Sequence, residues 1–433
     1  MCKRGNVDMK RKLNKNYEKL KRKAQEKTQQ ILQGETTQKE EQEFSFTQGE
    51  EAKGKQVGVS PVVTPTPDPT PAPAQENTES IKITMLGASG SGKTVFLSGI
   101  YQTLVSATAH GFFLSIDEDA KRSEQFRSLE GISLITEDKD EGFKVIGFPS
   151  GTAVTKTYDF TLKSKGRSYF PFEFWDYRGN LVSEVTPGSK ATTDKAEIES
   201  FREHLRKSDV LLIFADATKI SQYDVPSVRK MKSQAYLMEK VFNTVLDMVE
   251  REYHVILVLT KIDDQDVKIE DKKDNYKLLC EKAMEVFSSI RDGSKTFAMI
   301  PVSAVGENKT EKVILEDDDG KIIRTTKLKE DVVPSPININ TVMIYACMRV
   351  LKNKVQKIQR EIKYLWKDAE EIEESYARLR GKDLRKRQDE YDKIVFGEIP
   401  NKEAEQKKIE DDIKEIKKVY GTTLRENTYY KKE

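Results

Sequence analysis

The sequence of 433 residues predicts an α/β fold, with a doubly wound sheet followed by a C-terminal helical hairpin. Short apolar runs of strand length, such as 210–214 and 255–259, recur between residues 81 and 306. A glycine-rich loop joins the first of these runs to a segment with one apolar helical face. After Met343, apolar residues keep an unbroken 4-3 spacing among charges, which is typical of a coiled coil.

Composition divides the chain into four predicted parts. Only 36% of residues are apolar and 34% are charged, so part of the chain is expected to be non-globular. Residues 1–35 are predicted to be a basic helical arm, because apolar residues lie on a 4-3 spacing among lysines and arginines. Residues 36–80 are predicted to be a disordered linker rich in Pro and Thr. The α/β domain is placed at 81–350 and the coiled-coil helical hairpin at 351–433.

The returning helix of the hairpin is expected to start near residue 401. Gly, Pro and Asn lie between residues 397 and 401, and Asn401 is a plausible N-cap. Glu403 and Glu405 would then lie in a first turn whose dipole favours acids.

Charge and cysteine usage narrow the class of protein. The 74 basic and 72 acidic side chains nearly cancel, so no nucleic-acid partner is expected. Each apolar run is far shorter than the roughly 18 residues of a membrane-spanning helix, so no transmembrane segment is predicted. The 3 cysteines are far apart and match no disulfide framework or zinc pattern, which favours a reducing, cytoplasmic location.

The first motif lies between the strand predicted at 81–86 and the helix predicted at 95–105. It fits G-x-x-x-x-G-K-[ST], in which backbone N–H groups approach phosphates and the helix N-terminus adds a favourable dipole. Lys93 would hold the β- and γ-phosphates, and Thr94 would hold Mg²⁺. The other residues of this phosphate-binding loop are Gly87, Ala88, Ser89, Gly90, Ser91 and Gly92.

The second motif is D-x-x-G, at the end of the apolar run 172–175. Asp176 can reach the magnesium shell through a water. Gly179 can present its backbone N–H to a γ-phosphate, because no side chain intrudes.

Two further strand ends carry motifs that suit base recognition. The run 255–259 leads into Thr260, Lys261 and Asp263, a tetrad of the form [NT]-K-x-D. An aspartate there accepts both the ring N–H and the exocyclic amine of guanine, a pair that adenine cannot supply. The backbone at Ser303 and Ala304 could donate to guanine O6. These residues favour GTP over ATP.

In this order, GASGSGKT, WDYRG, TKID and SA resemble the guanine motifs of the small-GTPase-like, TRAFAC-class P-loop superfamily over about residues 81–350. The segment 147–152, which leads into a strand predicted at 155–162, more narrowly resembles the bacterial double-GTPase type found in conflict systems. The resemblance implies a threonine that closes over magnesium, either Thr152 or, as runner-up, Thr155. It also implies slow hydrolysis, because Asn180 stands where many members carry the glutamine that orients the attacking water. A partner, or Arg178, could assist.

Three insertions distinguish the chain from a minimal GTPase and are expected to form a partner surface. The first leaves room for a strand and a helix around 112–129, and the second lengthens the second switch at 185–206. The third reads as a β-hairpin over 312–327, with Asp319 and Gly320 at its turn.

The sequence therefore predicts a Mg²⁺-dependent GTP-binding switch that hydrolyses GTP slowly to GDP and phosphate and controls a partner through helical arms. The alternative is a nucleotide-binding coiled-coil scaffold with negligible hydrolysis. The heptads predict a helical protein partner or self-association through the coiled coil.

Overall fold

The computed structural model describes residues 80–432 apart from 106–111, 117–154, 165–166, 178–180, 182–194, 249–252, 265, 268–271, 317–321, 330–331, 333 and 377–378. The predicted basic arm and all of the predicted linker except Ser80 lie outside these residues. Within the described residues, no helix has the length and apolar character needed to cross a membrane.

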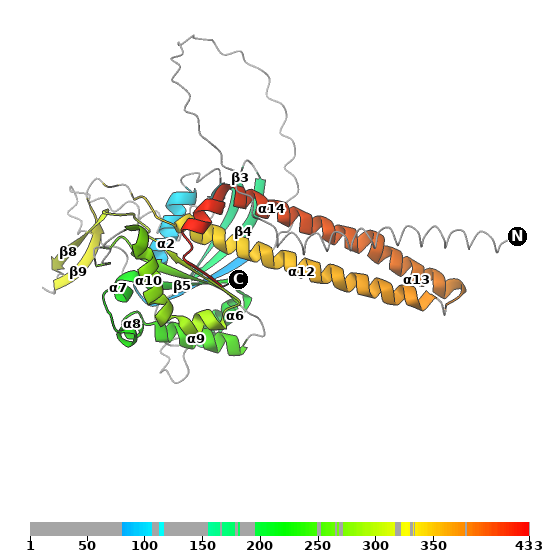
Figure 1. Cartoon of the computed structure of the whole chain (residues 1–433), viewed down its shortest axis with the longest axis horizontal. Helices are drawn as coiled ribbons and strands as arrows, with labels where there is room; N and C mark the ends of the chain where they lie inside the picture. The colour runs from blue at the N-terminus through cyan, green and yellow to red at the C-terminus, as the bar shows by residue number, and fades with distance from the viewer. Residues whose placement is uncertain are drawn as a thin grey trace, which may run out of the picture. The chain divides into compact units, whose positions relative to one another are not determined.

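The described chain is built on an eight-stranded sheet with the order β10-β7-β6-β5-β1-β4-β3-β2 (Figure 1). The strands β4, β1, β5, β6 and β7 are parallel to one another, whereas β3 is antiparallel to β4, β2 to β3, and β10 to β7. In chain order the strands are β1 Ile81–Gly87, β2 Phe112–Ser115, β3 Lys156–Ser164, β4 Arg167–Asp176, β5 Val210–Asp216, β6 His254–Thr260, β7 Thr296–Pro301 and β10 Tyr430–Lys432.

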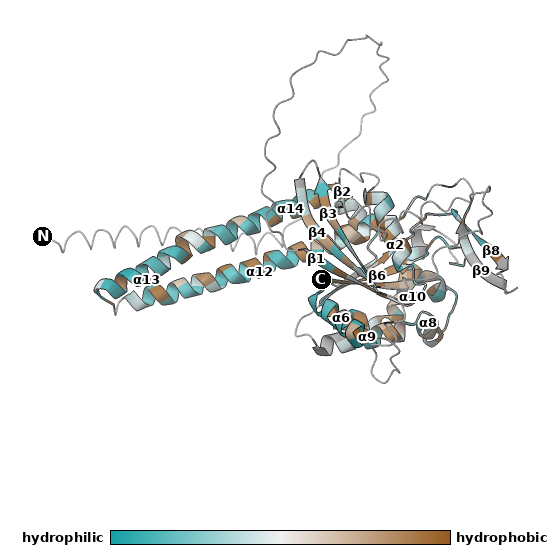
Figure 2. Cartoon of the chain, turned by 180° about the vertical axis from the view of Figure 1, so that it is seen from behind, coloured by the Kyte–Doolittle hydropathy of each residue, from teal (hydrophilic) through white to brown (hydrophobic). Residues whose placement is uncertain are grey.

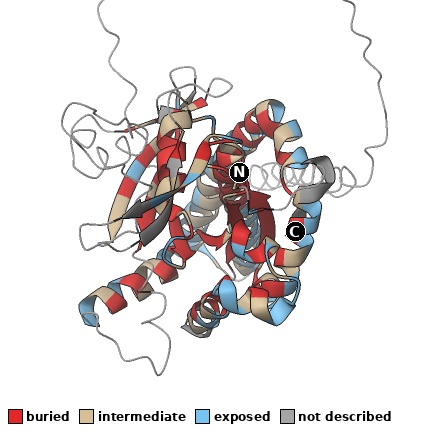
Figure 3. Cartoon of the chain, turned by 90° about the vertical axis from the view of Figure 1, so that its left-hand side faces the viewer, coloured by how far each residue is buried: buried red, intermediate tan, exposed pale blue. Residues whose placement is uncertain are grey.

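The central strands are continuously apolar because both faces of the sheet are covered. In β5, Val210, Leu212 and Phe214 belong to one hydrophobic core, and the alternate residues belong to the other. This period of two is the expected pattern for side chains on opposite faces of a strand. Figure 3 shows the central strands coloured mostly as buried, because one hydrophobic core lies on each face of the sheet. The predicted α/β fold is confirmed.

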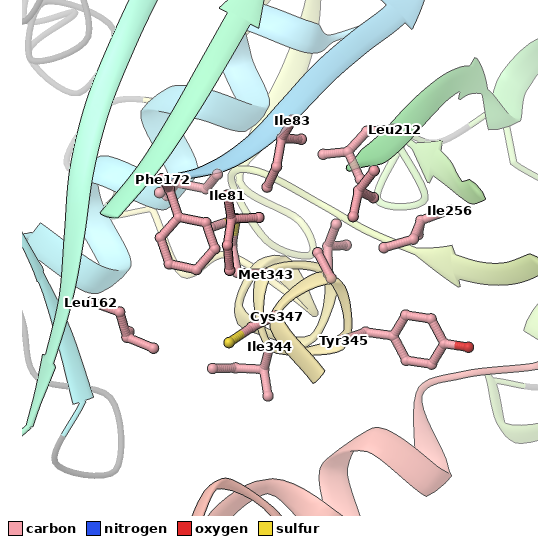
Figure 4. Close-up of a cluster of buried hydrophobic side chains, with 14 of the residues drawn as sticks. Ile81, Ile83, Leu162, Phe172, Leu212, Ile256, Met343, Ile344, Tyr345 and Cys347 are labelled. Atoms are coloured by element: carbon pink, nitrogen blue, oxygen red, sulfur yellow. The ribbon is translucent and has the colours of Figure 1, made fainter. Parts of the chain in front are cut away.

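Helices cover the two faces of the sheet in separate groups. One core contains residues of α2 (Lys93–Ile100), α12 (Ile339–Ser375) and α14 (Ile399–Glu426). Figure 4 shows Ile83, Leu212 and Ile256 of three neighbouring strands gathered over the first turns of α12. The other core contains residues of α6 (Lys195–Lys207), α9 (Ala235–Met248) and α10 (Lys272–Val286). The short helices are α7 Ala217–Ser221, α8 Pro226–Lys232 and α11 Ser288–Gly293, and a π-helical turn at Tyr101–Val105 follows α2.

The structure shows parts of the predicted insertions. Strand β2 supplies the extra strand, while the helix expected beside it lies outside the described residues. The hairpin is confirmed as the antiparallel pair β8 (Thr310–Glu316) and β9 (Ile322–Leu328). Residues 182–194 of the lengthened second switch lie outside the described residues, and α6 follows them.

The C-terminal helices α12 and α14 lie side by side (Figure 1). The expectation that the returning helix starts at Asn401 is wrong. Helix α13 (Gly381–Lys393) continues through a π-helical turn, Ile394–Glu398, directly into α14. A proline within a helix lacks a donor and crowds the preceding turn. The wider π-helical turn just before Pro400 accommodates both effects, so the helix does not stop there.

The C-terminal helical hairpin is anchored in the sheet domain at both of its ends. Helix α12 is buried from its first residues and crosses residue 350 without a break. After α14, strand β10 pairs with β7. Beyond the sheet, apolar and polar residues alternate along α12 and α14 (Figure 2). The domain boundaries from the sequence remain a prediction.

Candidate functional site

The phosphate-binding loop is a close-packed turn between β1 and α2. A Cβ added at Gly87 would lie 2.5 Å from Ser91 Oγ and 2.9 Å from Phe214 Cβ, so a larger residue does not fit. Gly92 has φ +91, a left-handed conformation that side chains disfavour. Helix α2 begins at the next residue, so its free N–H groups lie at the loop, as an anion site requires.

The Lys93 side chain is buried in this loop. Its Nζ donates to the carbonyl oxygen of Gly87 at 2.8 Å and to that of Ala88 at 3.3 Å. Burial lowers the pKa of Lys93 to about 8, and the nearby charge of Asp176 acts in the opposite direction. An anionic group within the loop would stabilise the ammonium, because desolvation disfavours an isolated buried charge.

Thr94 and Asp176 place two side-chain oxygens, which could act as metal ligands, beside the loop. Thr94 Oγ1 donates to Asp176 Oδ2 at 3.0 Å. Asp176 is buried at the end of β4, opposite Met85 of β1 in the sheet register. A hydroxyl and a carboxylate are ligands of the type that Mg²⁺ takes alongside phosphate oxygens and waters. Among the described residues no cluster of His, Cys, Asp and Glu could hold a metal by itself.

Thr260 connects the base tetrad to the phosphate-binding loop. Its buried hydroxyl donates to the carbonyl oxygen of Ser91 at 2.7 Å, with that of Ala215 at 3.2 Å. Lys261 has φ +60, and its Nζ lies 2.7 Å from Asp216 Oδ2 at the end of β5. The carboxylate of Asp216 also caps α7 through Thr218. The loop after β1 and the ends of β5 and β6 are thus held in one hydrogen-bond network.

The two base motifs meet at Asp263 and Ser303. Burial raises the pKa of Asp263 above the usual value and is the largest effect on it. A hydrogen bond from the Ser303 side chain acts in the opposite direction. Ser303 Oγ also accepts from the backbone N–H of Gly306 at 2.7 Å and of Val305 at 3.2 Å. Ala304 is half-buried and packs against the hydrophobic core. The structure therefore brings these two predicted base-recognising loops together.

Several residues predicted to act in hydrolysis lie outside the described residues, namely Thr152, Arg178, Gly179 and Asn180. The runner-up Thr155 is described, and its hydroxyl donates to Glu197 Oε1 of α6 at 3.2 Å. The roles of these residues remain predictions.

The structure also shows two features that sequence reasoning missed. The first is Asp216, which could have been found as a polar residue at the end of an apolar run. The second is an aromatic cluster formed by Trp175 and Tyr177, the two chain neighbours of Asp176, with His204. Trp175 stacks on His204 of α6 with ring centroids 4.1 Å apart, and the Tyr177 hydroxyl hydrogen-bonds to His204 Nδ1. Burial lowers the pKa of His204. This cluster ties α6 to the strand that carries Asp176.

Comparisons with known proteins place this site in a family. Residues 81–295 match the family model "Double-GTPase 2". A comparison with curated proteins finds no matching relative.

Similar solved structures are distant. One is the signal recognition particle receptor SRb-GTP/SRX complex from Chaetomium thermophilum, at 11% identity and TM-score 0.28, covering 52% of this chain and 94% of that chain. Another is the S. cerevisiae Ski7 GTPase-like domain bound to GDP and inorganic phosphate, at 16% identity and TM-score 0.30, covering 52% and 43%. A third is Toc33 from Arabidopsis thaliana, at 13% identity and TM-score 0.24, covering 56% and 75%.

The family match begins at β1 and includes the phosphate-binding loop, the D-x-x-G strand and the base tetrad, the same three motifs that the sheet brings to one edge. Over residues 81–295 the chain is a small-GTPase-like P-loop GTPase, and this match supports binding of a guanine nucleotide.

Proposed function

We propose that this chain is a Mg²⁺-dependent GTP switch that hydrolyses GTP slowly to GDP and phosphate and acts on a partner through its helical hairpin. The observation that supports it best is the hydrogen bond from Thr260 to Ser91, because it joins base recognition to phosphate recognition through one buried side chain. We also propose a cytoplasmic location, since Cys280 and Cys347 are free, buried thiols.

Each described site residue has a defined role in this proposal. Lys93 binds the β- and γ-phosphates, and Asp263 accepts the two N–H groups of guanine through its carboxylate. Thr94 would hold Mg²⁺ directly, and Asp176 would hold it through a water. When bound, the ion would offset charge that develops on the phosphate oxygens.

Slow hydrolysis is proposed from the sequence. The side chain of Asn180 is one methylene shorter than that of the glutamine found in many family members. Its amide would therefore position the attacking water less well, and a partner could supply what is missing.

The first residues of the helical hairpin contact the strand end that carries the second base-recognising loop. The backbones of Ser303 and Ile337 form a bridge, in which the N to O distances of the two hydrogen bonds are 3.1 and 2.8 Å. Asn338, at the start of α12, donates its side-chain amide to the carbonyl oxygen of Pro301 at 2.9 Å. These contacts support a path from the nucleotide to the hairpin, which begins within a few residues of the site.

Single-turnover hydrolysis tests the switch against the scaffold alternative. We expect wild-type protein with GTP and Mg²⁺ to release phosphate faster than Lys93→Ala, which lacks the phosphate-binding ammonium. Nucleotide binding with phosphate release no faster than that variant would favour the scaffold.

Self-association through the hairpin is the partner mode that we favour. Tyr364 and Phe396 are exposed on its two arms, at 66% and 63%. A truncation at residue 350 would remove Ile358, Ile416 and Tyr420 from the core, so point variants are the better test. We expect Tyr364→Glu with Phe396→Glu to sediment as a smaller species than wild type. An unchanged sedimentation coefficient would contradict self-association at this surface.

A further inference from the structure

The β8–β9 hairpin contacts the loop that carries the guanine-reading aspartate. Lys312 of β8 lies with Nζ 3.3 Å from Asp264 Oδ1 and forms a second ion pair with Asp266 Oδ2. Asp264 directly follows Asp263. The β8–β9 hairpin begins shortly after Ser303, so one inserted element follows the Ser303 loop in the chain and contacts the Asp263 loop.

The loop after Asp263 is a compact turn built around Asp264. Its carbonyl oxygen accepts from Val267 N at 2.9 Å, and its Oδ1 accepts from Asp266 N at 2.8 Å. Its own N–H donates to the carbonyl oxygen of Lys261 at 3.1 Å. Lys312 therefore binds the same carboxylate oxygen that braces the turn internally, and it closes the turn from outside.

Burial decides how much this contact can contribute. The Asp264 side chain is 15% exposed, while those of Lys312 and Asp266 are 44% and 45% exposed. Fully exposed ion pairs contribute little, but a partly buried carboxylate is screened less by solvent. The Lys312–Asp264 pair is therefore the half of the contact that solvent screens less, and it is also the half adjacent to Asp263.

The charge of Lys312 also favours the ionised form of Asp263, in addition to the effect of Lys312 on the turn. Burial, first, and the neighbouring Asp264 carboxylate both raise the pKa of Asp263. The ammonium of Lys312, which lies beside the Asp264 carboxylate, offsets that repulsion. It therefore helps Asp263 to stay ionised and to accept two N–H groups.

We propose that Lys312 is a positioning residue for guanine recognition, which fixes the Asp264–Asp266 turn so that Asp263 meets both N–H groups of the base. The β8–β9 insertion is then part of the selectivity device for the 2-amino group of guanine. This role rests on the proposed GTP-binding function.

The test compares the affinities of GTP and inosine triphosphate, measured with full-length protein by competition against a fluorescent GTP analogue. Inosine lacks the 2-amino group, so it makes one of the two hydrogen bonds to Asp263 and depends less on its position. For Lys312→Ala we expect GTP affinity to fall about five-fold and inosine triphosphate affinity less than about two-fold, on the scale of a partly exposed ion pair. Lys312→Arg should retain the wild-type ratio.

Lys309→Ala is the matched control, because it removes a positive charge just before the same strand without touching these ion pairs, and it should leave the ratio unchanged. Equal losses for both nucleotides in Lys312→Ala, or no loss, would overturn the positioning role while leaving GTP binding intact. A wild-type chain that binds both nucleotides equally would overturn the guanine assignment itself.

Discussion

The phosphate end and the base end of the site both withdraw a charged side chain from water, Lys93 almost fully and Asp263 in part, and the effects on the two pKa values are opposite. Burial lowers the pKa of Lys93 to about 8 and raises that of Asp263. The first residue needs a proton to bind an anion, whereas the second must lose one to accept two N–H groups. The phosphate end should therefore lose affinity as pH rises and the base end as pH falls, and each can be tested separately.

The largest effect is expected from Lys93→Ala. Removing a buried ammonium that faces two phosphates should lower GTP affinity about 100-fold or more, since charge-assisted hydrogen bonds are the strong ones. Competition binding with fluorescent GTP measures the change. Lys219→Ala, at an exposed position of α7, is the control. A loss below ten-fold would show that Lys93 does not face the phosphates.

High pH should weaken the phosphate end. A bound polyphosphate stabilises the protonated amine, so affinity is full below pH 8 and falls as pH rises through the pKa of about 8 in the free protein. At pH 9 we expect GTP affinity roughly ten-fold below that at pH 7. Calorimetry in buffers of different ionisation enthalpy should detect proton uptake on binding. A flat profile from pH 7 to 9 would contradict the assignment, and Lys93→Ala should show such a profile.

Low pH should weaken the base end. Because the pKa of Asp263 is raised, the ionised form is lost at a higher pH than for an ordinary aspartate. The preference for GTP over inosine triphosphate should fall as pH decreases through that raised value, while phosphate binding through Lys93 persists. The ratio of the two affinities measures this. A ratio that stays constant down to the pH of unfolding would argue against Asp263 as the acceptor.

The smallest of these effects is expected from Thr260→Val, which keeps the shape but removes the hydroxyl that links the two ends. A neutral hydrogen bond contributes about 1 kcal/mol, so affinity for GTP and for inosine triphosphate should fall together, about five-fold. Thr244→Val on α9 is the control, because this hydroxyl donates only to the carbonyl oxygen of Lys240 in its own helix. A change for one nucleotide alone would mean that Thr260 serves the base loop and not the link.

The sequence predicted the sheet and the four motifs because each motif is local: a strand, a turn and a few polar residues. It did not predict the Thr260–Ser91 bond or the Lys312 contact, since these join residues far apart in the chain. The start of the returning helix was missed for a different reason. Gly397 and Pro400 are strong local stop signals, and a π-helical turn overrides them.

Nucleotide preference in Asp263→Ala tests the central claim most directly. Wild-type protein should bind fluorescent GTP far more tightly than fluorescent ATP, and the variant should lose that preference because it can no longer accept both N–H groups of guanine. An unchanged preference for GTP in Asp263→Ala would contradict the account of guanine recognition.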